Sequence, residues 1–139
     1  MIERLTPPGV AIPRGPYSPA VRAGDFIYVS GQIPVDPETN KPVLGEIAQE
    51  TRQVLSNIMR ILDACGATRA DVVKCQVYLT DVKDFAAMNE VYSEFFGEAK
   101  PARTTIGVAA LPLPGAKIEI DAVAYAPFNK TDAISHPTK

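Results

Sequence analysis

The sequence predicts an α+β domain in which two helices pack on one face of a mostly antiparallel, mixed β-sheet. The first observation is the distribution of proline: the chain has 13 prolines, yet none lies between Pro42 and Pro101. Because proline interrupts helices beyond their first turn, this window favours helices. The second observation is hydrophobic periodicity, which is helical in two stretches of the window and alternating between and around them. The resulting order of strands, helix, strand, helix and strands is typical of α+β proteins.

Length and composition limit the class of protein. The chain has 139 residues, of which 46% are hydrophobic and 22% charged, so it fits one globular domain rather than a disordered segment. We expect this domain to span residues 1–127, followed by a polar, flexible tail over residues 128–139. The net charge of −2 gives no excess of positive charge to neutralise phosphates, which makes a nucleic-acid partner unfavourable.

Two further properties bear on location and on metal binding. No apolar run approaches the roughly 18 residues of a membrane span, and the chain does not begin with an apolar signal segment. We therefore expect a cytoplasmic protein without a membrane partner. Cys65 and Cys75 lie in apolar segments without a neighbouring cysteine or histidine, which predicts two buried thiols rather than a disulfide or a metal site.

The predicted strands of the N-terminal part precede the first helix. Residues Phe26–Ile33 are rich in β-branched and aromatic residues. Short segments at Arg4–Leu5 and Ala20–Arg22 are expected to add strands at the edge of the sheet.

The first predicted helix runs from Glu46 to Cys65. Its apolar residues recur at intervals of three and four, and its polar residues, Glu50 and Asn57 among them, lie mostly on the opposite side. Glu46 and Glu50 are near its start, where the helix dipole favours carboxylates, and Gly66 ends it.

The remaining elements follow the same logic. Val72–Thr80 alternates as a strand, and Asp84–Phe96 forms a second amphipathic helix that ends at a glycine. Arg103–Ala109 and Lys117–Tyr125 are predicted strands. The proline-rich segment 111–115 between them suits a hairpin loop, so we expect these two strands to pair.

Alternation along the strands separates two faces of the sheet. In the strand from residue 72, one face carries Val73, Cys75, Val77 and Leu79. In the last strand, one face is apolar and the other carries Lys117, Glu119, Asp121, Val123 and Tyr125. Two helices cover only one face of a sheet this wide, so the mixed face is expected to contact a second copy of the chain.

Three groups of residues are candidates for chemistry. Glu119 and Asp121 share a strand face, where a half-buried carboxylate has a raised pKa and can handle a water or a proton; the alternative is a solvated or salt-bridged pair. Arg103 and Thr105 share a face after Pro101, where a guanidinium can hold a small carboxylate; the alternative is an interface salt bridge. Tyr17 lies in a stiff Gly-Pro-Tyr-Ser-Pro turn that presents a phenol to a pocket or is an ordinary rigid loop.

Other catalytic arrangements lack their residues. The single histidine, His136, lies in the predicted tail. The sequence therefore does not favour a histidine-containing catalytic triad or metal site. The chain also lacks a glycine-rich phosphate loop of either standard spacing.

Five segments, taken in order, resemble the signatures of the RidA (YjgF) family of reactive-intermediate enamine/imine deaminases. They are Gly15-Pro16-Tyr17-Ser18-Pro19-Ala20, Val29-Ser30-Gly31-Gln32-Ile33-Pro34, Met88-Asn89-Glu90-Val91-Tyr92 with Phe95-Phe96, Pro101-Ala102-Arg103-Thr104-Thr105, and Lys117-Ile118-Glu119-Ile120-Asp121. The resemblance covers about residues 1–127. It implies a chorismate-mutase-like α+β fold and a homotrimer with active sites in the clefts between subunits.

The resemblance also implies an activity and its residues. Family members of the deaminase type hydrolyse 2-aminoacrylate, 2-aminocrotonate and related imines to 2-keto acids and ammonia, without a cofactor or a metal. By motif position, Arg103 would bind the substrate carboxylate, Glu119 would activate water, and Tyr17 would place its phenol beside the substrate. Further residues of the substrate site would be Ser30, Gly31, Asn89 and Thr105.

Two departures from the family pattern affect substrate preference. Many close relatives of the deaminase branch have cysteine where this chain has Thr105; a backbone N–H contact survives that change, whereas a role of a thiol does not. The connection over residues 97–100 is short and reshapes one wall of the cleft. Two alternatives stay open: a non-catalytic trimeric protein that binds 2-keto acids or other metabolites, and a ribonuclease or translation inhibitor.

Overall fold

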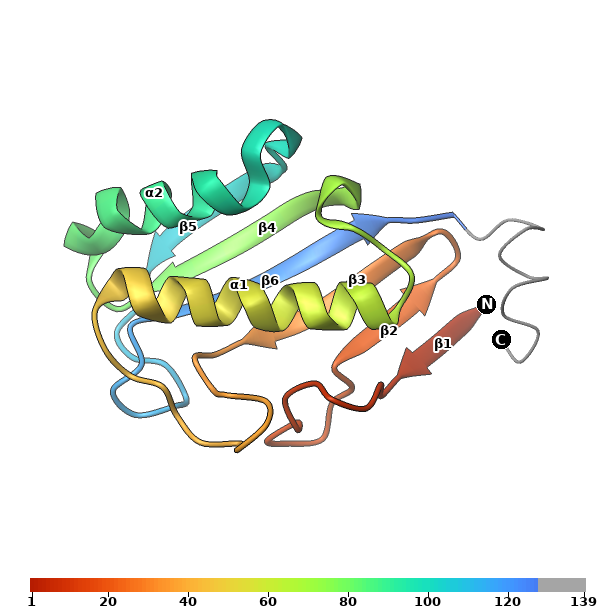
Figure 1. The fold of residues 1–139 in the computed structure, drawn as a ribbon, viewed down its shortest axis with the longest axis horizontal. Coiled ribbons are helices and arrows are strands. Elements are labelled where there is room, and N and C mark those ends of the chain that lie inside the picture. The colour runs from red at the N-terminus through yellow and green to blue at the C-terminus, as the bar shows by residue number, and fades with distance from the viewer. Residues whose placement is uncertain (128–139) are drawn as a thin grey trace.

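The computed structural model describes residues 1–127; the predicted tail, including His136, lies outside the described residues. The described chain forms six strands and two α-helices (Figure 1). The strands are β1 (Ile2–Leu5), β2 (Ala20–Ala23), β3 (Phe26–Gln32), β4 (Val72–Leu79), β5 (Ala102–Gly107) and β6 (Ile118–Tyr125). The helices are α1 (Ile47–Ala64) and α2 (Phe85–Phe96), and short 3₁₀ turns span Arg69–Asp71, Val82–Asp84 and Gly97–Ala99.

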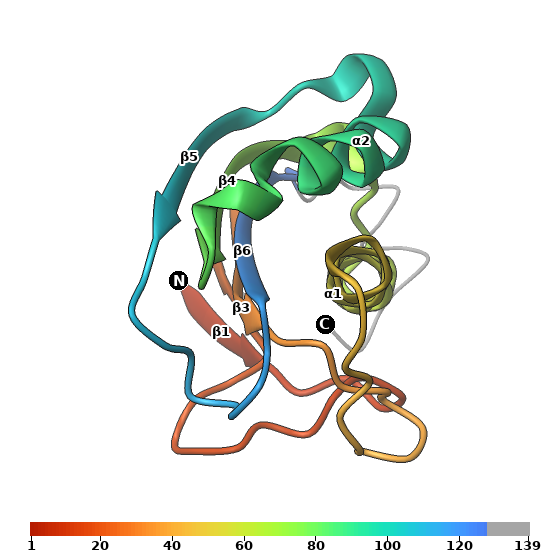
Figure 2. The same ribbon diagram turned by 90° about the vertical axis from the view of Figure 1, so that its left-hand side faces the viewer.

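The two helices run side by side on one face of the sheet, which we call the helical face; the opposite face, the open face, is bare (Figures 1 and 2). Fully buried aliphatic side chains fill the space between helices and sheet, which removes the largest apolar surfaces of both from water. They include Ile58, Ile61 and Leu62 of α1, Met88 of α2, and Ile27, Ile118 and Ile120 of the sheet. The predicted α+β class, with both helices on one face, is confirmed.

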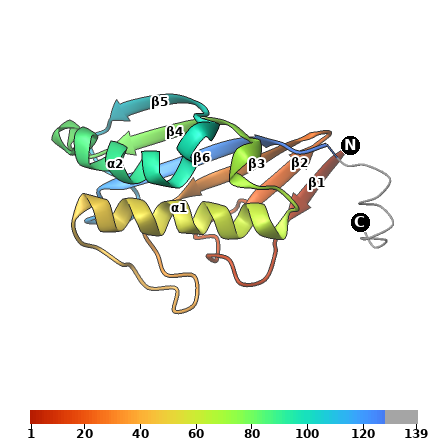
Figure 3. The same cartoon turned by 45° about the horizontal axis from the view of Figure 1, so that its top comes forward.

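The strand order is β1-β2-β3-β6-β4-β5, and within residues 1–127 only β4 and β5 pair in parallel. The predicted hairpin between the last two strands is therefore wrong, because β4 lies between them (Figure 3). A parallel pair needs a long crossover, which α2 supplies between β4 and β5. The proline-rich connection then carries the chain past the end of β4 to β6.

Two of the α1 residues that were predicted to lie on its polar side, Glu50 and Asn57, are buried. The carboxylate of Glu50 accepts hydrogen bonds from the backbone N–H of Lys117 at 2.7 Å and of Gly45 at 3.1 Å. The side-chain amide of Asn57 donates to the carbonyl of Val35 at 2.8 Å. Because buried polar groups require such partners, these contacts tie α1 to the loop before it and to the start of β6.

β4 departs from simple alternation at its start. The register with β6 shifts between Val72 and Lys74, which marks a β-bulge. As a result Val72 is buried, whereas Val73 is 43% exposed rather than facing the core. Cys75 is fully buried, and burial raises the pKa of its thiol to about 11; Cys65 is half-buried against the core, so the prediction of two buried thiols holds fully only for Cys75.

The open face exposes large apolar side chains around its charged centre. Tyr28 of β3 and Tyr125 of β6 are 48% and 46% exposed, and Ile106 on the outer strand is 45% exposed. Phe26 packs edge-on against Tyr125, with ring centroids 5.2 Å apart.

Among residues 1–127, no helix is both long and apolar enough to cross a bilayer, and those residues hold no group of three potential metal ligands.

Candidate active site in two parts

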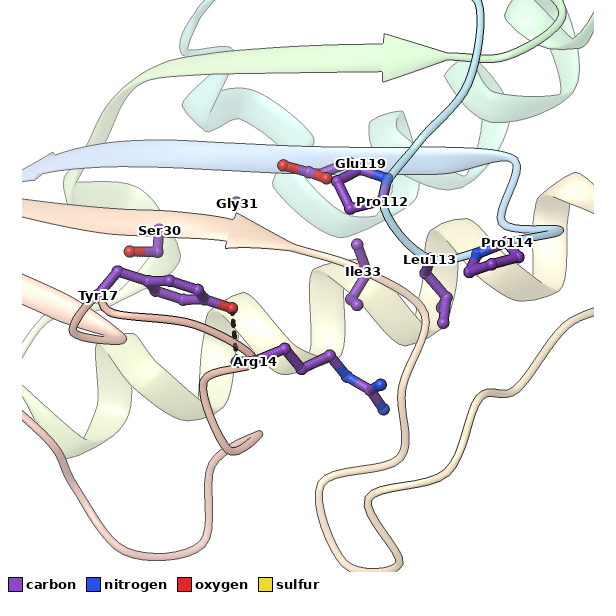
Figure 4. A pocket seen from close by; sticks show the side chains of 9 residues that line it. All are labelled: Arg14, Tyr17, Ser30, Gly31, Ile33, Pro112, Leu113, Pro114 and Glu119. Carbon is purple, nitrogen blue, oxygen red and sulfur yellow. Dashed lines mark hydrogen bonds between the residues drawn. The ribbon is translucent and has the colours of Figure 1, made fainter.

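The seven predicted site residues fall into two groups. Tyr17, Ser30, Gly31 and Glu119 line one pocket of about 570 Å³ (Figure 4). Its other walls are Arg14, Ile33, Pro112, Leu113 and Pro114. Arg103, Thr105 and Asn89 are absent from this lining and belong to β5 and α2.

Glu119 stands opposite a bulge in β3. Between two successive pairs of these strands, β3 has two residues, Ser30 and Gly31, whereas β6 has one, Asp121. A side chain at residue 31 would collide with the carboxylate of Glu119 and bring its first carbon within 3.0 Å of Glu119 Cδ. The absence of a side chain at Gly31 thus leaves the space that the carboxylate occupies (Figure 4).

The surroundings of Glu119 favour its protonated form. Burial, and secondarily the negative charge of Asp121, raises the pKa of the Glu119 carboxyl. Burial also raises the pKa of Asp121, although hydrogen bonds partly oppose it; one comes from the Tyr78 hydroxyl at 3.1 Å. A carboxyl whose pKa is above its ordinary value can exchange a proton with a bound water or substrate nearer to neutral pH.

Tyr17 is held over the pocket by backbone contacts. Its hydroxyl accepts a hydrogen bond from the backbone N–H of Arg14 at 3.1 Å, and its own N–H donates to the carbonyl of Gly15 at 2.9 Å (Figure 4). The hydroxyl of Ser30 donates to the carbonyl of Ser18 at 2.6 Å, which joins the turn to the bulge of β3. Tyr17, which is 48% exposed, therefore has a defined position in the pocket that Glu119 also lines.

Arg103 belongs to the helical face. In the parallel register it pairs with Cys75, which is fully buried beneath the helices. Its guanidinium carbon lies 4.7 Å from the ring centroid of Tyr92 and 5.5 Å from that of Phe85, both on α2. Asn89 is one helical turn from each ring and so shares the side of α2 that Arg103 contacts.

Thr105 also faces the helices, next to Val77 in the register. Its hydroxyl oxygen is buried and has no hydrogen-bond partner among the described residues. Buried polar atoms are normally satisfied, so Thr105 has an unused hydrogen-bonding group on the same face of β5 as Arg103.

The two groups cannot meet within one chain. Glu119 pairs with Tyr78 on the open face, whereas Arg103 pairs with Cys75 on the helical face, and β4 separates their strands. A site that uses both side chains therefore takes them from two chains.

Sequence reasoning missed part of the pocket. Arg14 was not singled out, although it directly precedes the Gly-Pro-Tyr turn. The residues 112–114 were assigned to a hairpin loop, although their nearness in sequence to Glu119 is a signal that they line its surroundings.

Comparisons with known proteins identify relatives of this chain over most of its length. A family profile described as Endoribonuclease L-PSP matches residues 9–126. A RutC family protein of Pyrococcus horikoshii is 55% identical over 113 residues, which cover 81% of this chain and 89% of the relative. A 2-iminobutanoate/2-iminopropanoate deaminase of Dermatophagoides farinae is 43% identical over 111 residues, covering 80% and 86%. The crystal structure of TdcF from E. coli with bound serine has a TM-score of 0.82 at 36% identity, covering 88% of this chain and 98% of that one.

The described residues form an α+β domain with a pocket beside a six-stranded mixed sheet. Solved structures named YjgF and RidA share this fold. The chain belongs to the RidA (YjgF) family, as its five motifs indicated.

Proposed function

We propose that this protein hydrolyses 2-imino acids and their enamine tautomers, 2-aminoacrylate and 2-aminocrotonate, to 2-keto acids and ammonia. The observation that carries the proposal is the half-buried Glu119 carboxyl, whose pKa is raised, in a pocket with the fixed phenol of Tyr17. The deaminase name of a relative that is 43% identical supports the same reaction.

The chemistry needs few groups. The carbon of an imine is already electrophilic, so a positioned water and a proton carrier suffice. The imine reacts with its nitrogen protonated. Ionised Glu119 accepts a proton from the water as the water oxygen adds to the C=N carbon, which gives a neutral amino alcohol. Glu119 then returns this proton to the nitrogen, and the C–N bond breaks to release ammonia while the hydroxyl becomes the carbonyl and gives its proton to the departing ammonia. Water is consumed and ammonia released, and no cofactor or metal is required.

The substrate carboxylate requires a cation. Arg103 is suited to this role because a guanidinium binds a carboxylate through two hydrogen bonds, but within one chain it lies on the other face of the sheet from Glu119. We therefore propose a homotrimer in which Arg103, Thr105 and Asn89 of one subunit face Glu119, Tyr17, Ser30 and Gly31 of the next. The exposed aromatic side chains of the open face support such contacts.

Two other functions remain alternatives. The structure of TdcF with bound serine supports a protein that binds metabolites without turnover. The endoribonuclease description of the family profile raises RNA cleavage, which the net charge of −2 disfavours.

One assay separates these functions. Threonine dehydratase supplies 2-aminocrotonate, and release of 2-ketobutyrate is followed with and without the protein. The proposal predicts acceleration that Glu119→Gln removes and Glu94→Gln, an exposed carboxylate on the outer side of α2, retains. Keto-acid binding without acceleration supports the binding protein, and cleavage of RNA by the wild type but not by Glu119→Gln supports the nuclease.

Assembly and location are tested separately. Sedimentation at micromolar concentration is expected to show a trimer, and a stable monomer would contradict the shared site. We also propose a cytoplasmic location, which cell fractionation tests.

A further inference from the structure

Arg14 is the second charged side chain of the pocket, and the proposed mechanism does not use it. Its side chain lines the same cavity as Glu119 and Tyr17, and its backbone N–H holds the Tyr17 hydroxyl at 3.1 Å (Figure 4). Because that contact is made by the backbone, the side chain is available for another role.

The guanidinium of Arg14 is tethered but not neutralised. One terminal nitrogen donates to the carbonyl of Asn40 at 3.2 Å. Among residues 1–127, the ion pairs join Arg60 with Glu38 and Lys117 with Glu50, so no carboxylate pairs with Arg14. An arginine has five N–H donors, and a single carbonyl leaves most of them free to bind an anion.

The surrounding walls strengthen such binding. Ile33, Pro112, Leu113 and Pro114 supply apolar surface beside Arg14, and partial exclusion of water strengthens a bond between a guanidinium and a carboxylate. The cavity of about 570 Å³ also has room for a longer molecule than a three-carbon imino acid.

We propose that Arg14 adapts the pocket to 2-imino acids that carry a second carboxylate on their side chain. This inference rests on the proposed function, in which Arg103 of a neighbouring subunit holds the carboxylate next to the imine carbon. Arg14 then binds the distal carboxylate, so imines of four- and five-carbon dicarboxylic amino acids are better substrates than 2-iminobutanoate.

The test compares two imines made in place by amino-acid oxidases, 2-iminoglutarate from glutamate and 2-iminobutanoate from 2-aminobutyrate. The measured quantity is the ratio of kcat/KM for the dicarboxylic imine to that for 2-iminobutanoate. We expect a ratio above one, reduced on the order of tenfold by Arg14→Met because a charge-assisted contact is lost. Arg14→Lys retains the charge and should lie between the two, and Arg52→Met, an exposed arginine of α1, is the matched control.

The result also distinguishes this inference from the proposed function. Hydrolysis of both imines with a ratio that Arg14→Met leaves unchanged would overturn the role of Arg14 and leave the deaminase intact. If neither imine is hydrolysed, the deaminase fails, and calorimetry with 2-oxoglutarate and 2-oxobutyrate decides the role of Arg14. Tighter binding of 2-oxoglutarate that is lost in Arg14→Met supports it, and equal affinity of the wild type for both overturns it.

Discussion

The Glu119 pocket and the Arg103 region use opposite means to position a charge. Glu119 occupies space left by Gly31 in a bulge, beneath a turn fixed by backbone hydrogen bonds. Arg103 extends from a regular strand beneath a regular helix and rests against two aromatic rings. In the proposed reaction, Glu119 carries the proton and Arg103 binds the substrate carboxylate, and the sheet separates the two side chains. Each region fixes its own charged side chain, but neither contains both groups that the proposed reaction needs. We therefore assign the site to two chains.

Loss of the Arg103 guanidinium is expected to reduce activity the most. Arg103→Ala should lower kcat/KM by on the order of 10² to 10³ and weaken binding of unreactive 2-keto acids, because a charge-assisted contact is lost in both states. Arg69→Ala is the matched control, since Arg69 also lies over a ring of α2, Phe95, at 4.4 Å but on the outer surface. Wild-type affinity of Arg103→Ala for pyruvate in calorimetry would favour the alternative role of Arg103, an interface salt bridge.

Loss of the proton carrier should act on turnover alone. Glu119→Gln keeps the shape of the side chain and removes the base, so kcat should fall by on the order of 10² with keto-acid binding largely kept. Steady-state kinetics and calorimetry on the same preparation separate the two effects. If Glu119→Gln loses keto-acid binding and turnover equally, Glu119 contributes to binding of the substrate rather than to proton transfer.

The neighbour of Glu119 should shift its titration. Asp121 raises the pKa of Glu119 less than burial does, so Asp121→Asn should lower that pKa in part. In the proposed mechanism the ionised carboxylate is the base, so activity should be lost as the pH falls through this pKa. In Asp121→Asn the acidic limb of the pH–kcat/KM profile should therefore move to lower pH. If the acidic limb of the Asp121→Asn profile stays in place or moves to higher pH, the charge of Asp121 does not raise the pKa of Glu119.

The smallest effect is expected at Thr105. Its hydroxyl is buried without a partner among the described residues, and a thiol of similar size places a weaker hydrogen-bonding group there. Thr105→Cys should therefore stay within about tenfold of the wild-type kcat/KM, which corresponds to ~1.4 kcal/mol in the barrier. A larger loss would mean that the hydroxyl itself contacts the substrate.

Local patterns predicted the elements of the fold better than their pairing. The helices follow from three- and four-residue periodicity and end where expected, at Gly66 and Gly97, which have φ of +81° and +55°. The hairpin between β5 and β6 was wrong because the parallel pairing of β4 with β5 depends on where α2 returns the chain. Burial of Glu50 was missed for a similar reason, since its partner Lys117 is 67 positions away in the sequence.

Prediction of the site from the sequence also succeeded for local motifs and failed for contacts between distant segments. Motif positions identified Tyr17, Ser30, Gly31 and Glu119, and the fold brings all four to one pocket. The sequence did not show that Arg103 lies on the other face, because this depends on its register with Cys75 across a parallel pair. Arg14 was missed although its backbone N–H contacts Tyr17 three positions further on, because its place in the pocket depends on the approach of residues 112–114 from far along the chain.

Complementation between two inactive variants tests the shared site most directly. Equal amounts of Arg103→Ala and Glu119→Gln chains are unfolded together, refolded and assayed for 2-ketobutyrate release. In a closed trimer, an intact site takes Arg103 from one variant and Glu119 from the other, so random mixing predicts about one quarter of wild-type activity. Activity no higher than the average of the two variants refolded separately would contradict a site shared between chains.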